Sequence, residues 1–306
     1  MTKRSTASTD NSNIRANFNS PAVIINMAAG RSSDISEEVI TIFERFNYPK
    51  PTIQLVEPWE LAKALETIKR GATDLLVIYG GDGTCKSGAM VAREAGIPLL
   101  ALPGGTMNML PKALYGTDKW QDALELALSQ SGPRWQVGGL VNERIFFCGA
   151  IIGDPITMSE ARESLRDGEI IEAVKQLPDI VTAIAHGDQF EFKVDGKIFE
   201  TQANGLQIYC PSMTKGATNP GAFELASVPQ LSIAQVFGIG ARALTQDWRD
   251  SVHVKTAHAQ HVSIYGNGAF EILLDGESET VKCPIDVKFE TEGVRVLAPN
   301  LDKVAT

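Results

Sequence analysis

The sequence has little positive charge for its length. Among its 306 residues, 28 Lys and Arg stand against 37 Asp and Glu, which gives a formal net charge of -9 and a pI near 5.1. Proteins that hold nucleic acid through its phosphates, or that adhere constantly to anionic lipid, need a basic surface. The charge balance therefore excludes general nucleic-acid binding and a permanent electrostatic anchor, and leaves transient contact with a membrane open.

Long hydrophobic runs are also absent. A membrane-spanning helix needs about 20 consecutive apolar residues, and the longest candidates, residues 145–153 and 231–240, are short and interrupted. The first 20 residues are rich in Ser, Thr and Asn and lack the hydrophobic core of a signal peptide. We therefore expect a disordered tail at residues 1–20 and a cytoplasmic protein.

Paired cysteines are missing as well. The four cysteines form no CxxC pair, so the sequence predicts free thiols in a reducing compartment and neither a disulfide framework nor a zinc site. His258 and His261 have metal-ligand spacing, but no acidic or cysteine partner lies nearby in the sequence. We favour hydrogen-bonded or solvated histidines.

The two halves of the chain have different hydrophobic periods. In the first half, short apolar runs alternate with helical patterns, which predicts a parallel sheet built from βαβ units. These runs are residues 22–25, 53–56, 75–79 and 98–102. In the second half, alternating residues flank the turns Asp195-Gly196 and Asp275-Gly276, which predicts antiparallel hairpins. Helical patterns there cover residues 159–186 and 231–248.

The strongest local signal follows the third predicted strand. Gly80-Gly81-Asp82-Gly83-Thr84 leads from that strand into a helix. Glycines there expose backbone amides, and a helix N-terminus favours an anion such as phosphate. An Asp among those amides suggests Mg²⁺ or a general base. The alternative is a strand-to-helix turn that needs its glycines for geometry alone.

A second glycine-rich loop follows the next strand. It reads Pro103-Gly104-Gly105-Thr106-Met107-Asn108 and again leads into a helix. Parallel strands deliver both loops to the carboxyl edge of the sheet, where open α/β sheets bind ligands. Neither a dinucleotide GxGxxG after the first strand nor a GK[ST] phosphate loop is present.

These two loops, at this spacing, resemble those of the diacylglycerol kinase catalytic-domain family, which includes bacterial lipid kinases, sphingosine kinases and ceramide kinases. Asn26 with Gly30 is similar to the turn after the family's first strand, although Met27 replaces its proline. Leu274-Asp275-Gly276-Glu277 is similar to its C-terminal hairpin. The resemblance spans roughly residues 21–300.

The resemblance implies a nucleotide-binding α/β domain at residues 21–132, completed by residues 292–306, and a β-sandwich lipid-substrate domain at residues 133–291. It implies an active site between them. ATP would be held by Asn26, Gly80, Gly81, Asp82, Gly83, Thr84, Gly105, Thr106 and Asn108. Asp275 or Asp82 would be the catalytic base, and Asp82 and Glu277 would lie near Mg²⁺.

The function implied is ATP-dependent phosphorylation of a hydroxyl of diacylglycerol, ceramide or a sphingoid base, during transient visits to the membrane. A homodimer is left open. Met109 stands where bacterial members usually have Asp, which leans towards a sphingolipid acceptor. This and other missing acidic positions motivate an alternative, a nucleotide- or lipid-binding protein without turnover. A further alternative is an NAD kinase-like enzyme, whose fold shares the Gly-Gly-Asp-Gly-Thr loop.

Overall fold

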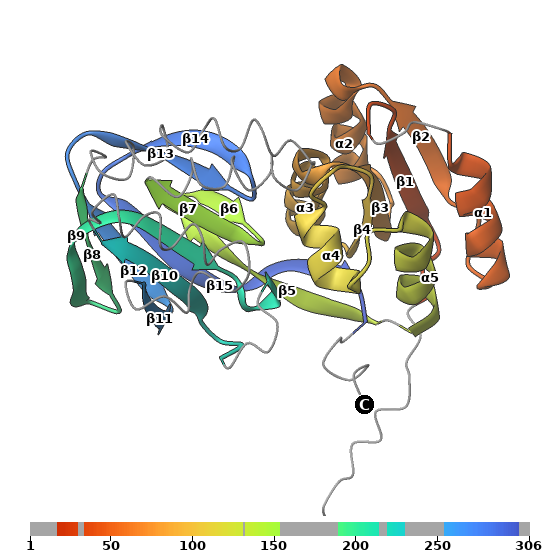
Figure 1. Cartoon of the computed structure of the whole chain (residues 1–306). Coiled ribbons are helices and arrows are strands. Elements are labelled where there is room, and N and C mark those ends of the chain that lie inside the picture. Colours follow the sequence, from red (N-terminus) through yellow and green to blue (C-terminus); the bar gives the residue numbers. More distant parts are fainter. Residues whose placement is uncertain are drawn as a thin grey trace, which may run out of the picture. The chain divides into compact units, whose positions relative to one another are not determined.

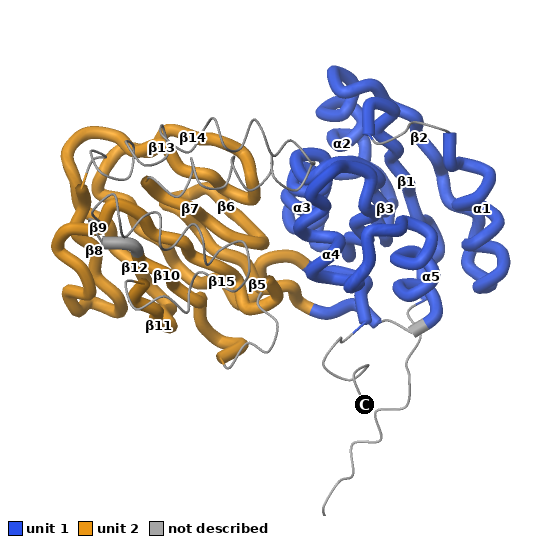
Figure 2. The backbone as a smooth tube through the Cα atoms, viewed as in Figure 1, with its two compact units in different colours: residues 1–134, 295–306 blue, residues 135–294 orange. Residues whose placement is uncertain are grey.

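The computed structural model of the chain describes residues 17–29, 34–130, 132–153, 189–213, 219–229 and 254–299. The helical stretches that the sequence predicts at residues 159–186 and 231–248, and most of the predicted tail, lie outside the described residues. The chain divides into two compact units (Figure 2). Unit 1 comprises residues 1–134 and 295–306, and unit 2 comprises residues 135–294.

Unit 1 is built on a parallel sheet. Its strands β1 (Pro21–Asn26), β3 (Leu75–Gly80) and β4 (Leu99–Pro103) consist only of buried residues, as expected of parallel strands that helices cover on both faces. The strand order is β2-β1-β3-β4, with β2 (Thr52–Val56) at the outer edge (Figure 1). The end of β15 (Ile285–Leu297) extends the sheet, because Val296 pairs with Leu99 of β4.

The helices of unit 1 follow the strands in regular alternation. The connections from β1 to β2 and from β2 to β3 run in opposite directions along the sheet, so right-handed connections place their helices on opposite faces. No helix in the described ranges is long and apolar enough to cross a bilayer. The helices are α1 (Ser36–Arg45), η1 (Pro58–Glu60), α2 (Leu61–Arg70), α3 (Asp82–Ala95), α4 (Met109–Tyr115) and α5 (Trp120–Gln130).

Unit 2 is an antiparallel β-rich structure, which confirms the change of period in the sequence. Its longest path of paired strands runs β14-β13-β7-β9-β8-β12-β15, and β10, β11, β5 and β6 branch from it. The strands are β5 (Pro133–Val141), β6 (Arg144–Phe146), β7 (Gly149–Gly153), β8 (Phe190–Val194), β9 (Lys197–Tyr209), β10 (Phe223–Pro229), β11 (Lys255–Ala259), β12 (His261–Tyr265), β13 (Ala269–Leu274), β14 (Glu277–Lys282) and β15, with η2 (Pro211–Met213) after β9.

The core of unit 2 combines aliphatic side chains with a group of phenylalanines. Phe190 and Phe192 of β8 point inward while the residues between and after them are partly exposed, as the period-two pattern predicts. The rings of Phe190 and Phe270 pack edge to face with their centroids 5.5 Å apart, and those of Phe223 and Phe289 do so at 5.0 Å. Such pairs add to the burial of apolar area. The core therefore fixes which face of each strand is exposed.

The two Asp-Gly turns predicted from the sequence are present. Asp195 and Gly196 connect β8 to β9 with φ of 47° and 81°, and Asp275 and Gly276 connect β13 to β14 with φ of 55° and 89°. Two positive φ values in a two-residue hairpin loop are typical of a type I′ turn, which matches the twist of the flanking strands.

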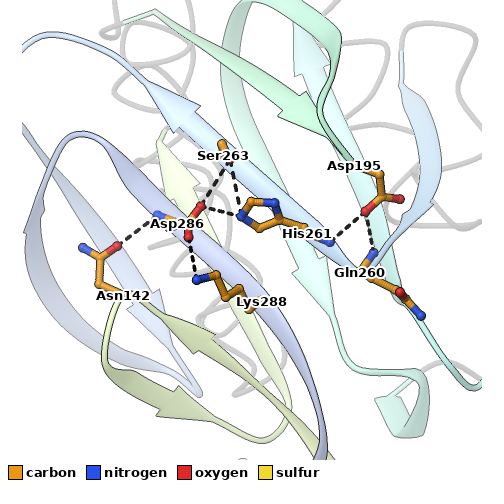
Figure 3. Close-up of polar contacts among 7 residues, drawn as sticks. All are labelled: Asn142, Asp195, Gln260, His261, Ser263, Asp286 and Lys288. Atoms are coloured by element: carbon orange, nitrogen blue, oxygen red, sulfur yellow. Dashed lines mark hydrogen bonds and ion pairs between the residues drawn. The ribbon is translucent and has the colours of Figure 1, made fainter.

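A polar cluster lies on β12 and β15 (Figure 3). His261 Nε2 is 2.5 Å from Asp286 Oδ1, and Ser263 Oγ donates to the same oxygen at 3.2 Å. The set has the composition of a hydrolase triad, but its geometry differs. The serine relay uses one imidazole nitrogen for Ser and the other for Asp, whereas here Nε2 faces both Asp286 and Ser263. The cluster is a structural cross-strand contact.

We predict that this cluster gives unit 2 part of its acid sensitivity. Burial raises the pKa of Asp286, but hydrogen bonds from His261, Lys288 and Ser263 outweigh burial and hold it below its ordinary value. A lowered pKa stabilises the fold above the ordinary Asp value of about 3.9, and that stabilisation is lost as pH falls through the folded-state pKa. Asp286→Asn should flatten the fall in unfolding free energy below about pH 4.

Urea unfolding of both proteins between pH 3 and pH 7 measures this. Asp195→Asn, which changes an exposed carboxylate of unit 2, is the control and should retain the acid dependence. Parallel curves for Asp286→Asn and the unsubstituted protein would contradict the assignment.

Candidate functional site

The carboxyl ends of β1 and β3 mark a point where the chain reverses direction along the sheet. From β1 the chain moves to β2 on one side, and it later returns to β3 on the other side. Helices that leave adjacent strands towards opposite faces open a crevice at such a point, where α/β sheets bind their ligands. Asn26 ends β1, and Gly80 ends β3. The sequence-predicted loops therefore lie at the position where the topology favours a site.

The two glycine-rich loops pack backbone against backbone. The amide of Gly104 donates to the carbonyl of Gly80 at 2.9 Å. A Cβ on Gly105 would lie 2.7 Å from Cα of Gly81, which is closer than real Cβ contacts, and a Cβ on Gly80 would overlap the Thr84 side chain at 2.4 Å. Gly80 and Gly105 are thus required by packing within the protein.

Gly81 is different. A Cβ there would meet only Cα of Gly105, at 3.8 Å, and its φ of -75° is open to any residue. The fold therefore does not need glycine at this position. A side chain at this position would fill the space beside the N-terminus of α3, which no side chain of the described residues caps.

Asp82 links the first loop to the second through hydrogen bonds. It is the first residue of α3, and its carboxylate accepts hydrogen bonds from the amides of Asn108 at 2.9 Å and Met109 at 2.6 Å. These amides begin α4 and have no partner within that helix. Asp82 thus caps α4 and occupies its N-terminus, while the N-terminus of α3 stays available to an external anion.

The environment of Asp82 disfavours its charge. Burial raises the pKa of Asp82, and the amides of Met109 and Asn108, with the positive charge of Lys112, only partly offset this effect. Because the folded-state pKa is raised, ionising Asp82 lowers the unfolding free energy as pH rises through that pKa. A cation brought by a ligand would relieve this cost.

Asn26 and Asn108 hold the loops in shape. Asn26 Nδ2 donates to Thr84 Oγ1 at 2.9 Å, and its Oδ1 accepts the amide of Ala28 at 3.1 Å. Asn108, with a φ of 52°, exchanges two hydrogen bonds of 2.7 Å with the backbone of Gly105. The Gly105 amide is therefore used within the loop, and Thr106 is exposed at its tip.

All nine residues that the resemblance assigned to ATP thus lie in unit 1. Hydrogen bonds join the segments that carry them: Asn26 bonds to Thr84, Gly104 to Gly80, and Asn108 to Asp82. Asp275 and Glu277 lie in unit 2. Lys86 of α3, which sequence reasoning did not single out, is buried, with 9% of its surface exposed. Its position one helical turn after the first loop is the sequence signal that could have marked Lys86 as a candidate site residue.

Cys85 lies beneath the first loop as a structural residue. Its thiol is within 3.7 Å of the Gly80 carbonyl and 3.9 Å of the Leu102 carbonyl. Burial raises the pKa of Cys85 strongly, so the thiol stays protonated and is not a nucleophile. Cys148 and Cys210 are also buried free thiols.

The carboxylate of Asp275 is turned into unit 2 rather than towards solvent. Only 6% of the residue is exposed. Oδ2 accepts the amide of Phe147 at 2.8 Å, and Oδ1 accepts the amides of Cys148 and Gly149 at 2.8 and 3.1 Å. Three consecutive amides therefore converge on this one side chain and position the segment that leads into β7.

Asp195 provides an internal comparison. It occupies the same position of the same turn type, and its carboxylate accepts the amides of Gln260 and His261 at 3.1 and 2.9 Å. No function was expected of Asp195, so anchoring a neighbouring strand is a sufficient explanation for an Asp at this turn position. Glu277, two residues after Asp275, is exposed at the start of β14.

Within the described residues, no group of three or more His, Cys, Asp and Glu side chains could hold a metal ion. Mg²⁺ usually takes one or two carboxylates and completes its shell with phosphate oxygens and water. A carboxylate has about four lone-pair sites, and Asp82 uses one on each oxygen for an amide. Asp82 therefore fits a metal that arrives with a polyphosphate.

Comparison with known proteins supports the fold and the loops. Residues 20–138 match the model of the diacylglycerol kinase catalytic domain, which confirms the resemblance seen in the sequence. A crystal structure of a diacylglycerol kinase from Bacillus anthracis (strain Sterne) superposes with a TM-score of 0.69 at 17% identity, covering 94% of this chain and 99% of that chain. At this identity, the likeness shows the fold alone.

Two curated relatives carry different names. An NAD kinase of Koribacter versatilis is 27% identical over 213 residues, which are 67% of this chain and 64% of the relative. The chain thus matches a little under two thirds of that enzyme's length. A candidate lipid kinase of Staphylococcus aureus (strain MSSA476) is 22% identical over 242 residues, covering 74% of this chain and 78% of the relative.

We predict that Asp275→Asn weakens the fold of unit 2. The Asn side chain keeps one acceptor but turns a donor towards an amide, and each buried donor left without a partner costs about 1–3 kcal/mol. The unfolding free energy should therefore fall by at least about 1 kcal/mol, measured by urea unfolding at pH 7.

The matched control is Asp195→Asn, because it changes the same turn position and water can replace its exposed carboxylate. Asp195→Asn should lower the unfolding free energy by clearly less than Asp275→Asn does. Equal losses in the two variants would show that the three buried hydrogen bonds of Asp275 contribute nothing beyond the turn.

Proposed function

We propose that this protein, whose residues 20–138 belong to the diacylglycerol kinase catalytic-domain family, is an ATP-dependent lipid kinase. Its acceptor would be a hydroxyl of diacylglycerol, of ceramide or of a sphingoid base. The observation that carries the proposal is the pair of interlocked glycine loops, which leaves the N-terminus of α3 uncapped beside Gly81. That arrangement suits the phosphates of a nucleotide.

In this proposal the phosphates of ATP bind beside Gly81, opposite the first amides of α3. Close approach of a phosphate explains why glycine occupies a position where the fold itself would accept a side chain. Asn26 and Thr84 support this surface from below through their shared hydrogen bond. Gly105 and Asn108 contribute by holding the second loop in place.

Asp82 is the better supported of the two candidate bases. Its carboxylate keeps lone pairs for a metal or a proton, and burial raises its pKa towards the range of a useful base. Mg²⁺ bound with ATP would neutralise the phosphate charge that develops during transfer. We assign Asp275 a positioning role, because its carboxylate is buried and accepts three amides. Glu277 is proposed to act near the metal because it is exposed.

A lipid acceptor requires contact with a membrane. The net charge of -9 argues for brief contact rather than permanent adhesion. We therefore propose a cytoplasmic protein that visits the membrane transiently to take its substrate.

One observation favours a second function. The match to an NAD kinase suggests a hydroxyl of a dinucleotide as the acceptor. Phosphoryl transfer depends mainly on positioning and charge neutralisation, so the same loops would serve either acceptor.

We predict γ-phosphate transfer from ATP to at least one lipid of a panel of diacylglycerol, ceramide and sphingosine in mixed micelles, with Mg²⁺. The measurement is radiolabel in the extracted lipid, and NAD is included as a separate acceptor. Label in NAD alone would favour the second function. ATP binding without label in any acceptor would indicate a protein that binds nucleotide without turnover.

We predict that Gly81→Ala weakens ATP binding without weakening the fold. Apart from its chain neighbours, the added Cβ meets no atom of the described residues closer than 3.8 Å, and it takes the space assigned to phosphate. An N-cap position favours glycine over alanine, whereas alanine lowers the conformational entropy of the unfolded chain. These two effects on the unfolding free energy have opposite signs and are each about 1 kcal/mol or less. We expect the Kd for ATP, measured by titration calorimetry, to rise by about tenfold or more, or about 1.4 kcal/mol.

Gly105→Ala is the matched control. Its Cβ would lie 2.7 Å from backbone of the other loop, and such overpacking typically costs about 1–3 kcal/mol. It should therefore lower the melting temperature, whereas Gly81→Ala should leave it nearly unchanged. Unchanged ATP affinity in a stable Gly81→Ala protein would place the phosphates elsewhere.

A further inference from the structure

The strand β2 has one edge without a partner in the part of the chain that the structure describes. It is the outermost strand of the unit 1 sheet and pairs in parallel with β1 on one side. Natural edge strands are usually protected by a charged side chain, a proline or a bulge within the strand. The residues of β2 are Thr52, Ile53, Gln54, Leu55 and Val56, which include none of these protections.

Ile53 and Leu55 present their backbone groups to this edge. The carbonyl of Val56 accepts the amide of Met27, the residue that follows β1, so Val56 is bonded towards the sheet. Backbone groups alternate sides along a strand, so Gln54 also faces β1. Ile53 and Leu55 therefore direct their amides and carbonyls outward, where they are ready to pair with another strand.

The edge is complementary to itself. If a twofold axis passes beside Gln54, an antiparallel copy places Leu55 opposite Ile53, and Ile53 opposite Leu55. Both pairs then use outward backbone groups and form four hydrogen bonds, with the two Gln54 residues as the central non-hydrogen-bonded pair. Moving the axis to Ile53 would instead pair Leu55 with Pro51, which has no amide to donate.

Side chains favour the same pairing. Leu55 is 45% exposed although it is apolar, and it would pack on Ile53 of the other copy across the strands. Exposed Lys50 precedes the strand, and Glu57 and Glu60 follow it, fixed by a reciprocal capping box. Antiparallel pairing therefore brings the positive end of each strand to the negative end of the other copy.

We propose that the occupant of this edge is a second copy of the same chain, paired antiparallel through β2 about Gln54. The resulting dimer has a closed isologous interface, as is common among homodimers. It joins two unit 1 sheets into one continuous sheet. This dimer is independent of which acceptor the protein phosphorylates.

A disulfide test reports both the dimer and its register. In a non-hydrogen-bonded antiparallel pair, Cα atoms lie about 4.5 Å apart, which a disulfide can bridge. Gln54→Cys, in a Cys283→Ser background, should therefore form a covalent dimer under mild oxidation. Thr52→Cys is the matched control, because the twofold axis separates its two copies by roughly 13 Å. It should stay monomeric on non-reducing gels.

Light scattering of the protein without added cysteines gives the second measurement. The molar mass should be that of a dimer, and Leu55→Lys should reduce it to that of a monomer. Ile198→Lys, which changes an exposed apolar residue of unit 2, should leave the dimer intact. A monomer before substitution, equal crosslinking of both cysteine variants, or a dimer that survives Leu55→Lys would each overturn the proposal.

Discussion

The carboxyl edge of the unit 1 sheet depends on a contact between two stretches of backbone. The loops after β3 and β4 approach so closely that Gly105 would clash with Gly81 if it carried a Cβ, and the amide of Gly104 closes the contact onto Gly80. Asp82 completes it by accepting the first amides of α4. Asp82 thus caps α4, whereas no side chain in the described part of the chain caps the N-terminus of α3, and such a terminus favours an anion.

This use of a carboxylate to accept backbone amides also explains why a catalytic role is difficult to assign to the acidic residues of this protein. Asp82, Asp195 and Asp275 all collect backbone amides from a neighbouring segment. A carboxylate does this well because its charged oxygens make short, strong hydrogen bonds. Loss of activity after replacing Asp82 or Asp275 therefore has two explanations, a missing base or a loosened loop, and a stability measurement is needed to separate them.

The sequence-predicted architecture is largely confirmed. An alternation of apolar strands and helical patterns predicts a parallel sheet, and the Asp-Gly turns predict the hairpins of unit 2. These features are local, since each depends on the period of a few residues or on the φ values that a turn demands. The role of a side chain, by contrast, depends on its contacts with segments far away in the sequence. Packing accounts for glycine at positions 80 and 105, where a Cβ would overlap neighbouring atoms, but not at position 81, where a Cβ would meet Cα of Gly105 at 3.8 Å.

The sequence by itself determined that two glycine loops follow strands of a parallel sheet and that Asp82 and Asp275 stand in candidate turns, because strand period and turn chemistry are written in short patterns. Only the tertiary structure decided what those residues contact. It turned Asp275 towards the amides of residues 147–149, more than a hundred positions away in the chain, and it left one edge of β2 without a partner among the described residues. Hydrogen-bond partners and unpaired edges arise from packing between distant segments, and no local pattern contains them.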